Sequence, residues 1–341
     1  MKKKKLFIAV LLGGVIGSAA AFAQEADTLH SWQKGPLQWS EYRGFGSAQE
    51  DTARSVIKLK KTTGKERDGY KRYFYPVVKA TFYPEYSFVS ESKKTNDELN
   101  QQQLLFDYKE LFARAYRDSL MLGVSDTKYT QELFSRRAET AFKEKWLTPS
   151  ELKAALAEDR FNPKSFQWEE TYGFFAQVGL DDRIFARTFS GIHPWTESFL
   201  LSGGYHKNRF SASFDIVLWF FGKPLFARSN HKTFQFSSQS LAFGYSFYKT
   251  ERFAFSALLG AGYGLLSSAK EYENAFVKEA LQADYTLFSY YITNNGKPER
   301  ADIQLFVRIG SDQMILSDGI IPCGLLDIGF RGKITYLKLK K

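Results

Sequence analysis

The sequence predicts a small α+β N-terminal domain followed by an all-β, antiparallel up-and-down barrel of about eight strands. Three observations lead to this prediction. Alternating apolar and polar residues fill the second half of the chain, in stretches near the ~10 residues that a tilted strand needs to cross a bilayer. Aromatic residues make up 17% of the 341 residues, yet the mean hydropathy is only −0.35. After the N-terminus, no run approaches the ~18 apolar residues of a transmembrane helix.

The N-terminus has the features of a secretory signal peptide. Lys2–Lys5 form a basic segment, residues 6–16 an apolar segment, and Ala21–Ala23 a small-x-small cleavage site. We therefore expect residues 1–23 to be removed, with a retained membrane anchor as the alternative. Residues 24–35 contain little apolar pattern, and we expect a flexible leader there. The residue directly after the cleavage site is Gln24 and not a cysteine, so the sequence does not predict a lipoprotein.

Charge and cysteine content narrow the possible partners. The chain has 47 basic and 37 acidic side chains, and without the four lysines of the signal peptide 43 basic ones remain, a net charge of +6. This excess is spread along the chain rather than gathered in a stripe, so nucleic acid is not an expected partner. The single cysteine, Cys323, forbids an intrachain disulfide and a cysteine-cluster metal site.

Residues 36–165 are expected to form an α+β domain. Arg54–Lys61 and Tyr73–Tyr83 have the composition of strands, and we expect the polar tract Thr62–Lys71 between them to be a loop. The apolar period then becomes helical over Asn96–Leu122, and a second helix is expected over Lys128–Lys145. A capping box with proline at the first helical position opens a third helix, which the sequence places at 149–158.

Eight alternating segments follow, and we expect them to form the barrel over residues 168–337. Successive side chains of a strand point to opposite faces, so each segment has one apolar and one small or polar face. The segments are centred on residues 172–180, 199–205, 210–220, 241–248, 253–265, 281–291, 303–309 and 326–336. Gly260, Gly262 and Gly264 recur every second residue with no helix after them, so we interpret them as small lumen-facing residues rather than a phosphate loop. Links between segments are alternately short and long, as in bacterial barrels.

The polar faces contain charges that could pair inside a barrel. We expect a lumen charge network in which three carboxylates, Asp215, Asp284 and Asp327, face three cations, Arg308, Arg331 and Lys333. Charges enclosed in a narrow lumen must be paired or wet. In the alternative, a soluble β-sandwich, these residues would be a solvated face. Phe214, Phe243 and Phe255 would then be buried against one another.

The C-terminal half resembles the small outer-membrane barrels of Gram-negative bacteria, especially those of the Bacteroidetes type. The stretches SLAFGY at Ser240–Tyr245 and GAGYG at Gly260–Gly264 carry this resemblance. It implies an up-and-down barrel surrounded by outer-membrane lipid. The chain departs from the pattern at its end, because such barrels commonly finish on an aromatic residue, whereas five residues, LKLKK, follow Tyr336 here.

The N-terminal half is similar to a family of predicted secreted zinc peptidases. The similarity lies in WSEYRG at Trp39–Gly44, VKATF at Val78–Phe82 and LLFDYKELFAR at Leu104–Arg114. In that family H-E-x-x-H stands just before F-D and holds zinc. The matching positions here are Gln101, Gln102 and Leu105, and none of them supplies a zinc-binding imidazole or a glutamate that activates water. The resemblance therefore implies an inactive, degenerate peptidase scaffold, and an unrelated amphipathic helix is the alternative.

Together these patterns favour a non-enzymatic outer-membrane barrel protein. We expect its N-terminal domain to lie in the periplasm, where it docks a protein partner or supports the barrel, and we expect no cofactor, metal or catalytic residue. Two alternatives stay open. One is a barrel-embedded, lipid-modifying enzyme that uses a residue such as His206 or Ser202, and the other is the soluble periplasmic β-sandwich as a binding module.

Overall fold

The computed structural model describes residues 29–45, 51–159, 161–185, 195–219, 235–267, 271–294, 297–316 and 319–340. The chain divides into two compact units. The first takes in residues 1–62, 76–120 and 125–161, and the second residues 63–75, 121–124 and 162–341. The predicted signal peptide lies outside the described residues. So does the predicted leader up to residue 28, whereas its remaining part forms the short elements β1 (His30–Ser31) and η1 (Trp32–Lys34).

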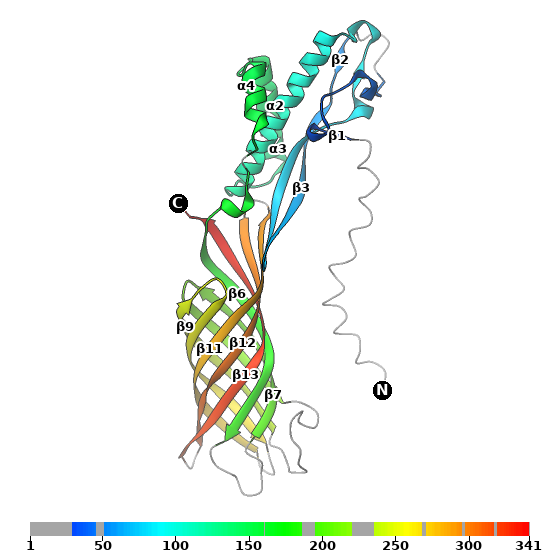
Figure 1. Ribbon diagram of the computed structural model, residues 1–341. Coiled ribbons are helices and arrows are strands. Elements are labelled where there is room, and N and C mark those ends of the chain that lie inside the picture. The colour runs from blue at the N-terminus through cyan, green and yellow to red at the C-terminus, as the bar shows by residue number, and fades with distance from the viewer. Residues whose placement is uncertain are drawn as a thin grey trace, which may run out of the picture. The chain divides into compact units, whose positions relative to one another are not determined.

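The second unit is a closed antiparallel barrel of eight strands (Figure 1). Each strand pairs with its neighbours in the chain, and β6 pairs with β13 to close the ring. The strands are β6 (Trp168–Phe185), β7 (Trp195–Lys207), β8 (Phe210–Trp219), β9 (Gln235–Lys249), β10 (Phe253–Ser267), β11 (Glu271–Asn294), β12 (Lys297–Leu316) and β13 (Gly319–Leu339). The predicted fold class is confirmed, and all eight predicted segments fall on these strands.

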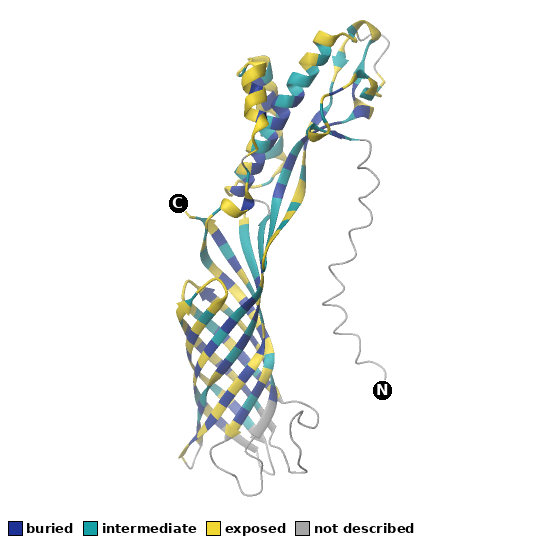
Figure 2. Cartoon of the chain, viewed as in Figure 1, coloured by how far each residue is buried: buried dark blue, intermediate teal, exposed yellow. Residues whose placement is uncertain are grey.

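Whether the aromatic side chains point outward or into a shared core distinguishes the barrel from the sandwich interpretation. Figure 2 shows buried and exposed residues alternating along the barrel strands. Phe214, Phe243 and Phe255 are 43%, 67% and 40% exposed, so they do not bury one another. Because the apolar rows face outward and the polar rows face inward, the barrel is inside out relative to a soluble protein. The sandwich interpretation is therefore wrong.

An aromatic belt surrounds the barrel near the rim of short turns. Its rings contact one another across neighbouring strands, as in the pairs Phe210–Tyr245, with ring centroids 5.1 Å apart, and Phe253–Tyr285, 4.9 Å apart. The belt consists of Tyr172, Tyr205, Phe210, Tyr245, Phe253, Tyr285 and Tyr336. Aromatic girdles of this kind mark the interface between hydrocarbon and water in membrane barrels.

Inward-facing glycines leave room for large side chains in the lumen. A Cβ placed on Gly262 would lie 2.6 Å from the Phe276 ring, and one on Gly204 would lie 2.4 Å from the Phe175 ring. These rings occupy the space that other side chains would need. Gly260, Gly262 and Gly264 therefore serve as small inner-face residues of β10, as interpreted from their period.

A long hairpin from the N-terminal half contributes to the barrel unit. It consists of β3 (Ile57–Asp68) and β4 (Lys71–Phe82), and Gly69, with a φ of +57°, supplies the left-handed conformation of its turn. The loop prediction for Thr62–Lys71 is wrong. The polar side chains of this strand gave no alternating pattern, because much of β3 has both faces exposed to solvent. The hydrogen bonds that pair β3 with β4 need only the backbone. Near its tip, Lys71–Phe74 pairs in parallel with Ser289–Ile292 of β11.

The first unit packs three helices with the remaining parts of β3 and β4. These helices are α2 (Asn96–Met121), α3 (Lys128–Lys143) and α4 (Pro149–Ala157). One side of α2 contributes Phe106 to the core against β4, and Tyr108 packs against α3 and α4. None of the described helices is both long and apolar enough to cross a membrane. Short elements complete the unit: η2 (Trp39–Glu41), β2 (Ala53–Arg54), η3 (Pro84–Tyr86), β5 (Phe88–Val89) and η4 (Glu91–Lys93).

Candidate functional site in the barrel interior

A four-residue charge cluster lies at mid-height in the lumen. Its centre is the Asp215 carboxylate on β8, which accepts hydrogen bonds from Lys278 Nζ at 3.1 Å and Arg308 Nη1 at 2.8 Å. Arg308 also lies 3.2 Å from Asp327. Cross-strand register brings these residues together, since Arg308 lies directly opposite Asp327 in the β12–β13 pair. Their side chains are at most 1% exposed, so the pairing offsets the cost of enclosing charge.

A second cluster lies one step further from the short turns. Arg183 and Asp181 are two residues apart on β6 and so share its inner face, where Arg183 Nε donates to Asp181 at 2.8 Å. Arg183 also pairs with Asp312 of β12. Asp181 and its neighbour Asp182 are adjacent in β6 and therefore point to opposite faces of the strand. Acidic pairs are common in loops, and only the pairing of β6 with β13 shows that Asp181 faces the lumen.

A third group contains two more residues of the predicted lumen network. Arg331 of β13 donates to Asp284 at 3.0 Å and to Gln177 Oε1 at 2.7 Å. Of the six residues predicted for the lumen network, the structure thus brings Asp215, Arg308 and Asp327 together and joins Arg331 to Asp284. Lys333 lies nearer the short turns, and no ion pair joins it to a described carboxylate.

Lys278 is a member of the network that sequence reasoning missed. It lies before the predicted segment 281–291, but it is four residues before Gln282 and therefore continues the inner-face row of β11. Extending the two-residue period backward along this strand would have found it. Its side chain is fully buried, because it reaches Asp215 across the lumen.

Apolar side chains fill the lumen between the charged groups. Leu200, Val217, Phe276, Phe306, Met314 and Cys323 form one buried cluster. An eight-stranded barrel has an interior just wide enough for side chains to fill. The apolar cluster and the ion pairs together occupy much of the described part of the lumen. Cys323 is fully buried and is a packing residue.

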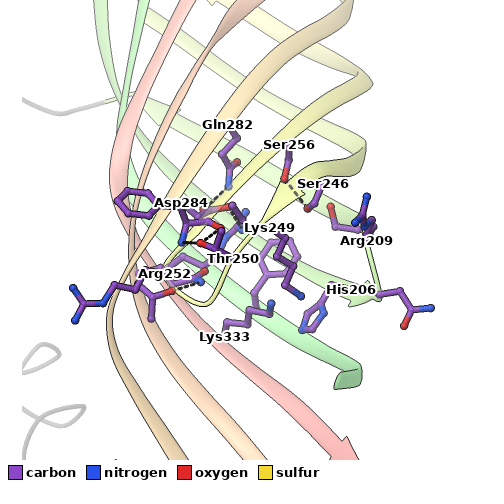
Figure 3. A pocket seen from close by; sticks show the side chains of 18 of the residues that line it. His206, Arg209, Ser246, Lys249, Thr250, Arg252, Ser256, Gln282, Asp284 and Lys333 are labelled. Atoms are coloured by element: carbon purple, nitrogen blue, oxygen red, sulfur yellow. Dashed lines mark hydrogen bonds and ion pairs between the residues drawn. The ribbon is translucent and has the colours of Figure 1, made fainter. Parts of the chain in front are cut away.

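A small pocket lies at the rim of short turns (Figure 3). Its cavity volume is about 50 Å³. Glu170 contacts two residues that line this pocket, because its carboxylate pairs with Lys249 of β9 and lies 2.7 Å from Arg300 of β12. The His206 imidazole lies beside them, 3.3 Å from Thr335 Oγ1.

The two candidate catalytic side chains do not form a pair. Ser202 and His206 share the inner face of β7, but four strand residues separate them by about 13 Å. Ser202 donates to Asp215 at 2.6 Å inside the charge cluster, whereas His206 lies in the rim pocket. A nucleophile and its base must lie within hydrogen-bond reach. This geometry gives no support to acyl-transfer chemistry by these residues.

The positions that match the zinc peptidase motif lie in the first three turns of α2. Gln102 donates to Glu98 at 2.8 Å, and Leu105 packs against the core of the first unit. Gln101 is exposed. In the described part of the chain, no group of three or more metal-ligating side chains converges. His30 is held by Glu41 and by the Gly35 carbonyl, and His193 and His231 lie outside the described residues.

Closed antiparallel strands with outward apolar rows and enclosed ion pairs define the class of small, outer-membrane-type β-barrels. Two solved structures are similar to this chain. One is Neisserial surface protein A, 14% identical with a TM-score of 0.31, matching 46% of this chain and 95% of that one. The other is Ail, the attachment invasion locus protein of Yersinia pestis, 16% identical with a TM-score of 0.28, matching 48% and 99%. No family model and no curated protein matches, and none of these comparisons supports the zinc peptidase resemblance.

Proposed function

We propose that this chain is a non-enzymatic outer-membrane barrel protein whose N-terminal unit lies in the periplasm and docks a protein partner or supports the barrel. One observation carries the membrane part of this proposal. The closed barrel presents large apolar side chains such as Phe243 and Leu281, 67% and 61% exposed, over its outer surface. Exposed apolar surface of this extent is stable only against lipid or another apolar surface.

The orientation follows from the turns. The chain enters the barrel at Trp168 and leaves it at Leu339, both at the rim where β7–β8 and β9–β10 are joined by short turns. Bacterial barrels place their short turns in the periplasm. The predicted signal peptide is consistent with export to that compartment. The N-terminal unit, which precedes β6, is therefore proposed to be periplasmic.

The filled lumen supports a role other than transport. Buried ion pairs around Asp215 and the apolar cluster around Phe306 occupy the cross-section that a solute would need. We expect the purified protein in planar bilayers to show no ohmic conductance above the background of the lipid. Stable single-channel steps would contradict this part of the proposal.

Fractionation and protease accessibility test the proposal together. We expect the full chain to sediment with the outer membrane and to migrate faster in gels before boiling, as closed barrels do. In intact cells, trypsin should spare the exposed Lys128–Arg136 segment of α3, and permeabilising the outer membrane should allow cleavage there. Recovery in the soluble fraction would refute the membrane assignment. Cleavage in intact cells would refute the periplasmic placement alone.

A further inference from the structure

The pocket at the short-turn rim has more positive charge than its acidic residues neutralise. Six lysine or arginine side chains line it: Arg209, Lys249, Arg252, Arg300, Arg331 and Lys333. Only two carboxylates, Glu251 and Asp284, line it as well. Neighbouring Glu170 and Asp302, both in contact with Arg300, reduce this excess but do not remove it, because six cations then stand against four carboxylates. The carboxylate of Glu251 is already engaged by Lys71.

Among the described residues, three cations of the pocket have no ion-pair partner, Arg209, Arg252 and Lys333, and of these three only Lys333 is partly buried. Its cross-strand neighbours are Asp302 and Phe175, yet no described carboxylate lies within ion-pair distance of its Nζ. Asp302 is instead held by Ser289 at 2.6 Å and by Arg300 at 3.0 Å. A cation in a narrow, partly enclosed mouth is less well hydrated than one at the surface, so an anion bound beside it would be stabilising.

Hydrogen-bond donors stand next to this charge. Figure 3 shows the side chains of His206, Lys249 and Lys333 beside one another in the pocket. The hydroxyls of Ser246 and Ser256, 2.8 Å apart, also line it. A mixed set of ammonium, imidazole and hydroxyl donors suits an oxyanion, because every oxygen can accept a hydrogen bond.

The size of the pocket limits the ligand to one small group. A water molecule needs about 10–15 Å³ of such space, so the cavity of about 50 Å³ admits a group of only a few non-hydrogen atoms. The mouth opens from inside the strand ring, whereas lipid surrounds the ring from outside. A soluble anion therefore reaches it more directly than a lipid headgroup does.

We propose that this rim pocket is a binding site for a phosphate-type oxyanion, free or on a small soluble ester, with Lys333 as its principal charged ligand. Phosphate satisfies the pocket better than a carboxylate does, because it offers more charge and more acceptor oxygens to several donors. Binding should weaken as salt is added, since part of the attraction comes from cations that stand in contact with water.

The test uses the full chain folded in detergent, with inorganic phosphate as the probe in isothermal titration calorimetry. Lys333→Gln should weaken binding about tenfold, the loss of one charge-assisted contact. The matched control is Lys338→Gln on the same strand, where the side chain is 61% exposed and pairs with Glu169. This control should bind within about twofold of the unaltered chain, within the range of a surface pair. Gel migration before boiling reports whether each variant is folded.

A second variant protects the test against misfolding. Arg209→Gln changes an exposed residue of the pocket lining and should weaken phosphate binding about threefold, as expected for a partly screened charge. Three outcomes would overturn the proposal: no binding of phosphate, equal binding of acetate, or equal losses in Lys333→Gln and Lys338→Gln. If a short-chain phosphatidylglycerol binds and inorganic phosphate does not, the ligand is a lipid headgroup and not the soluble anion proposed here.

Discussion

Lys71 Nζ lies 2.7 Å from the carboxylate of Glu251, and this contact joins the tip of the β3–β4 hairpin to the turn between β9 and β10. Tyr70 donates to the same carboxylate at 3.2 Å, and the Arg252 guanidinium lies 4.2 Å from the centre of the Tyr70 ring. Tyr73 stacks on Tyr291 beside these contacts. The tip is therefore held by side chains as well as by its parallel ladder with β11.

The Lys71–Glu251 contact should make hairpin docking sensitive to acid. The hydrogen bond from Lys71 holds the pKa of Glu251 below its ordinary value, although burial opposes this. A lowered folded-state pKa means that the stabilisation is present above the ordinary glutamate pKa and is lost as the pH falls towards the lower folded value. Because Glu251 is largely exposed, the effect should be at most about 0.5 kcal/mol.

Hydrogen exchange at Lys71–Phe74 measures this effect. Protection, after correction for intrinsic rates, should fall about twofold in Glu251→Gln at neutral pH. The variant should lose less protection on acidification than the unaltered chain does. Glu169→Gln, which breaks an exposed pair with Lys338, serves as the control and should leave protection at the hairpin unchanged. Equal acid sensitivity in Glu251→Gln would show that another group controls docking.

Gly173→Ala should destabilise the barrel at its short-turn rim. A Cβ there would lie 2.0 Å from the Ile334 carbonyl oxygen and 2.4 Å from His206 Nε2. The imidazole could move, but the backbone oxygen of β13 cannot without disturbing the seam between β6 and β13. Overpacking of this kind costs about 1–3 kcal/mol.

Gly203→Ala is the matched control for that substitution, because a Cβ on Gly203 meets nothing within 4 Å. The temperature at which each variant loses its fast gel migration would measure the difference. Gly173→Ala should convert at a lower temperature than the unaltered chain, and Gly203→Ala should not. Equal conversion temperatures for both variants would contradict the close packing at the seam.

Asp215→Asn should strongly destabilise the barrel. Asp215 is the carboxylate that both Lys278 and Arg308 contact, so its neutralisation removes the ion pair of Lys278 and leaves Arg308 paired with Asp327. Removing one partner of a buried ion pair typically costs about 3–5 kcal/mol. We expect little folded protein by gel migration. Replacing Asp215 and Lys278 together, by Asn and Met, should recover part of the yield, and no recovery would argue against their coupling.

Tyr108→Phe should weaken the first unit. The Tyr108 hydroxyl donates to the Leu147 carbonyl at 2.9 Å and accepts from the Leu147 amide at 2.8 Å. The substitution leaves both backbone groups without this partner, at a cost of about 1–3 kcal/mol. Hydrogen exchange of α2 in the full chain should report the loss. Tyr129→Phe, at a ring that is 73% exposed, should have no effect.

The purified full chain should contain no stoichiometric zinc. Gln101, Gln102 and Leu105 stand where the peptidase family has its ligands and its base, and a leucine side chain offers no metal-binding atom. Elemental analysis after purification without chelators provides the measurement. One zinc per chain would overturn both interpretations of this helix, the degenerate peptidase and the unrelated scaffold.

Sequence periodicity predicted the barrel well because lipid and lumen impose opposite demands on alternate residues. It could not predict where the strands end. Beyond the rim, β11 and β12 continue through Tyr291 and Arg300, where the alternation of apolar and polar residues fades. The β3 strand was missed for the same reason, since its polar residues match a solvated loop equally well.

The charge network was only partly predictable. Asp215 and Arg308 could be assigned to inner faces from the two-residue period, but their contact joins strands 93 residues apart. That distance depends on barrel closure and register, which no local pattern contains. Arg183 and Lys278 lie outside the predicted segments 172–180 and 281–291, so their carboxylate partners could not be chosen from the sequence.

The parallel ladder between β4 and β11 also constrains the order of biogenesis. Lys71–Phe74 emerges from the ribosome early, yet the edge it completes, Ser289–Ile292, is made only after most barrel strands exist. The hairpin tip can therefore pair with the barrel only after β11, the sixth barrel strand, has been synthesised. A chain truncated after β10 would retain every residue of the hairpin and still lack the strand that receives it.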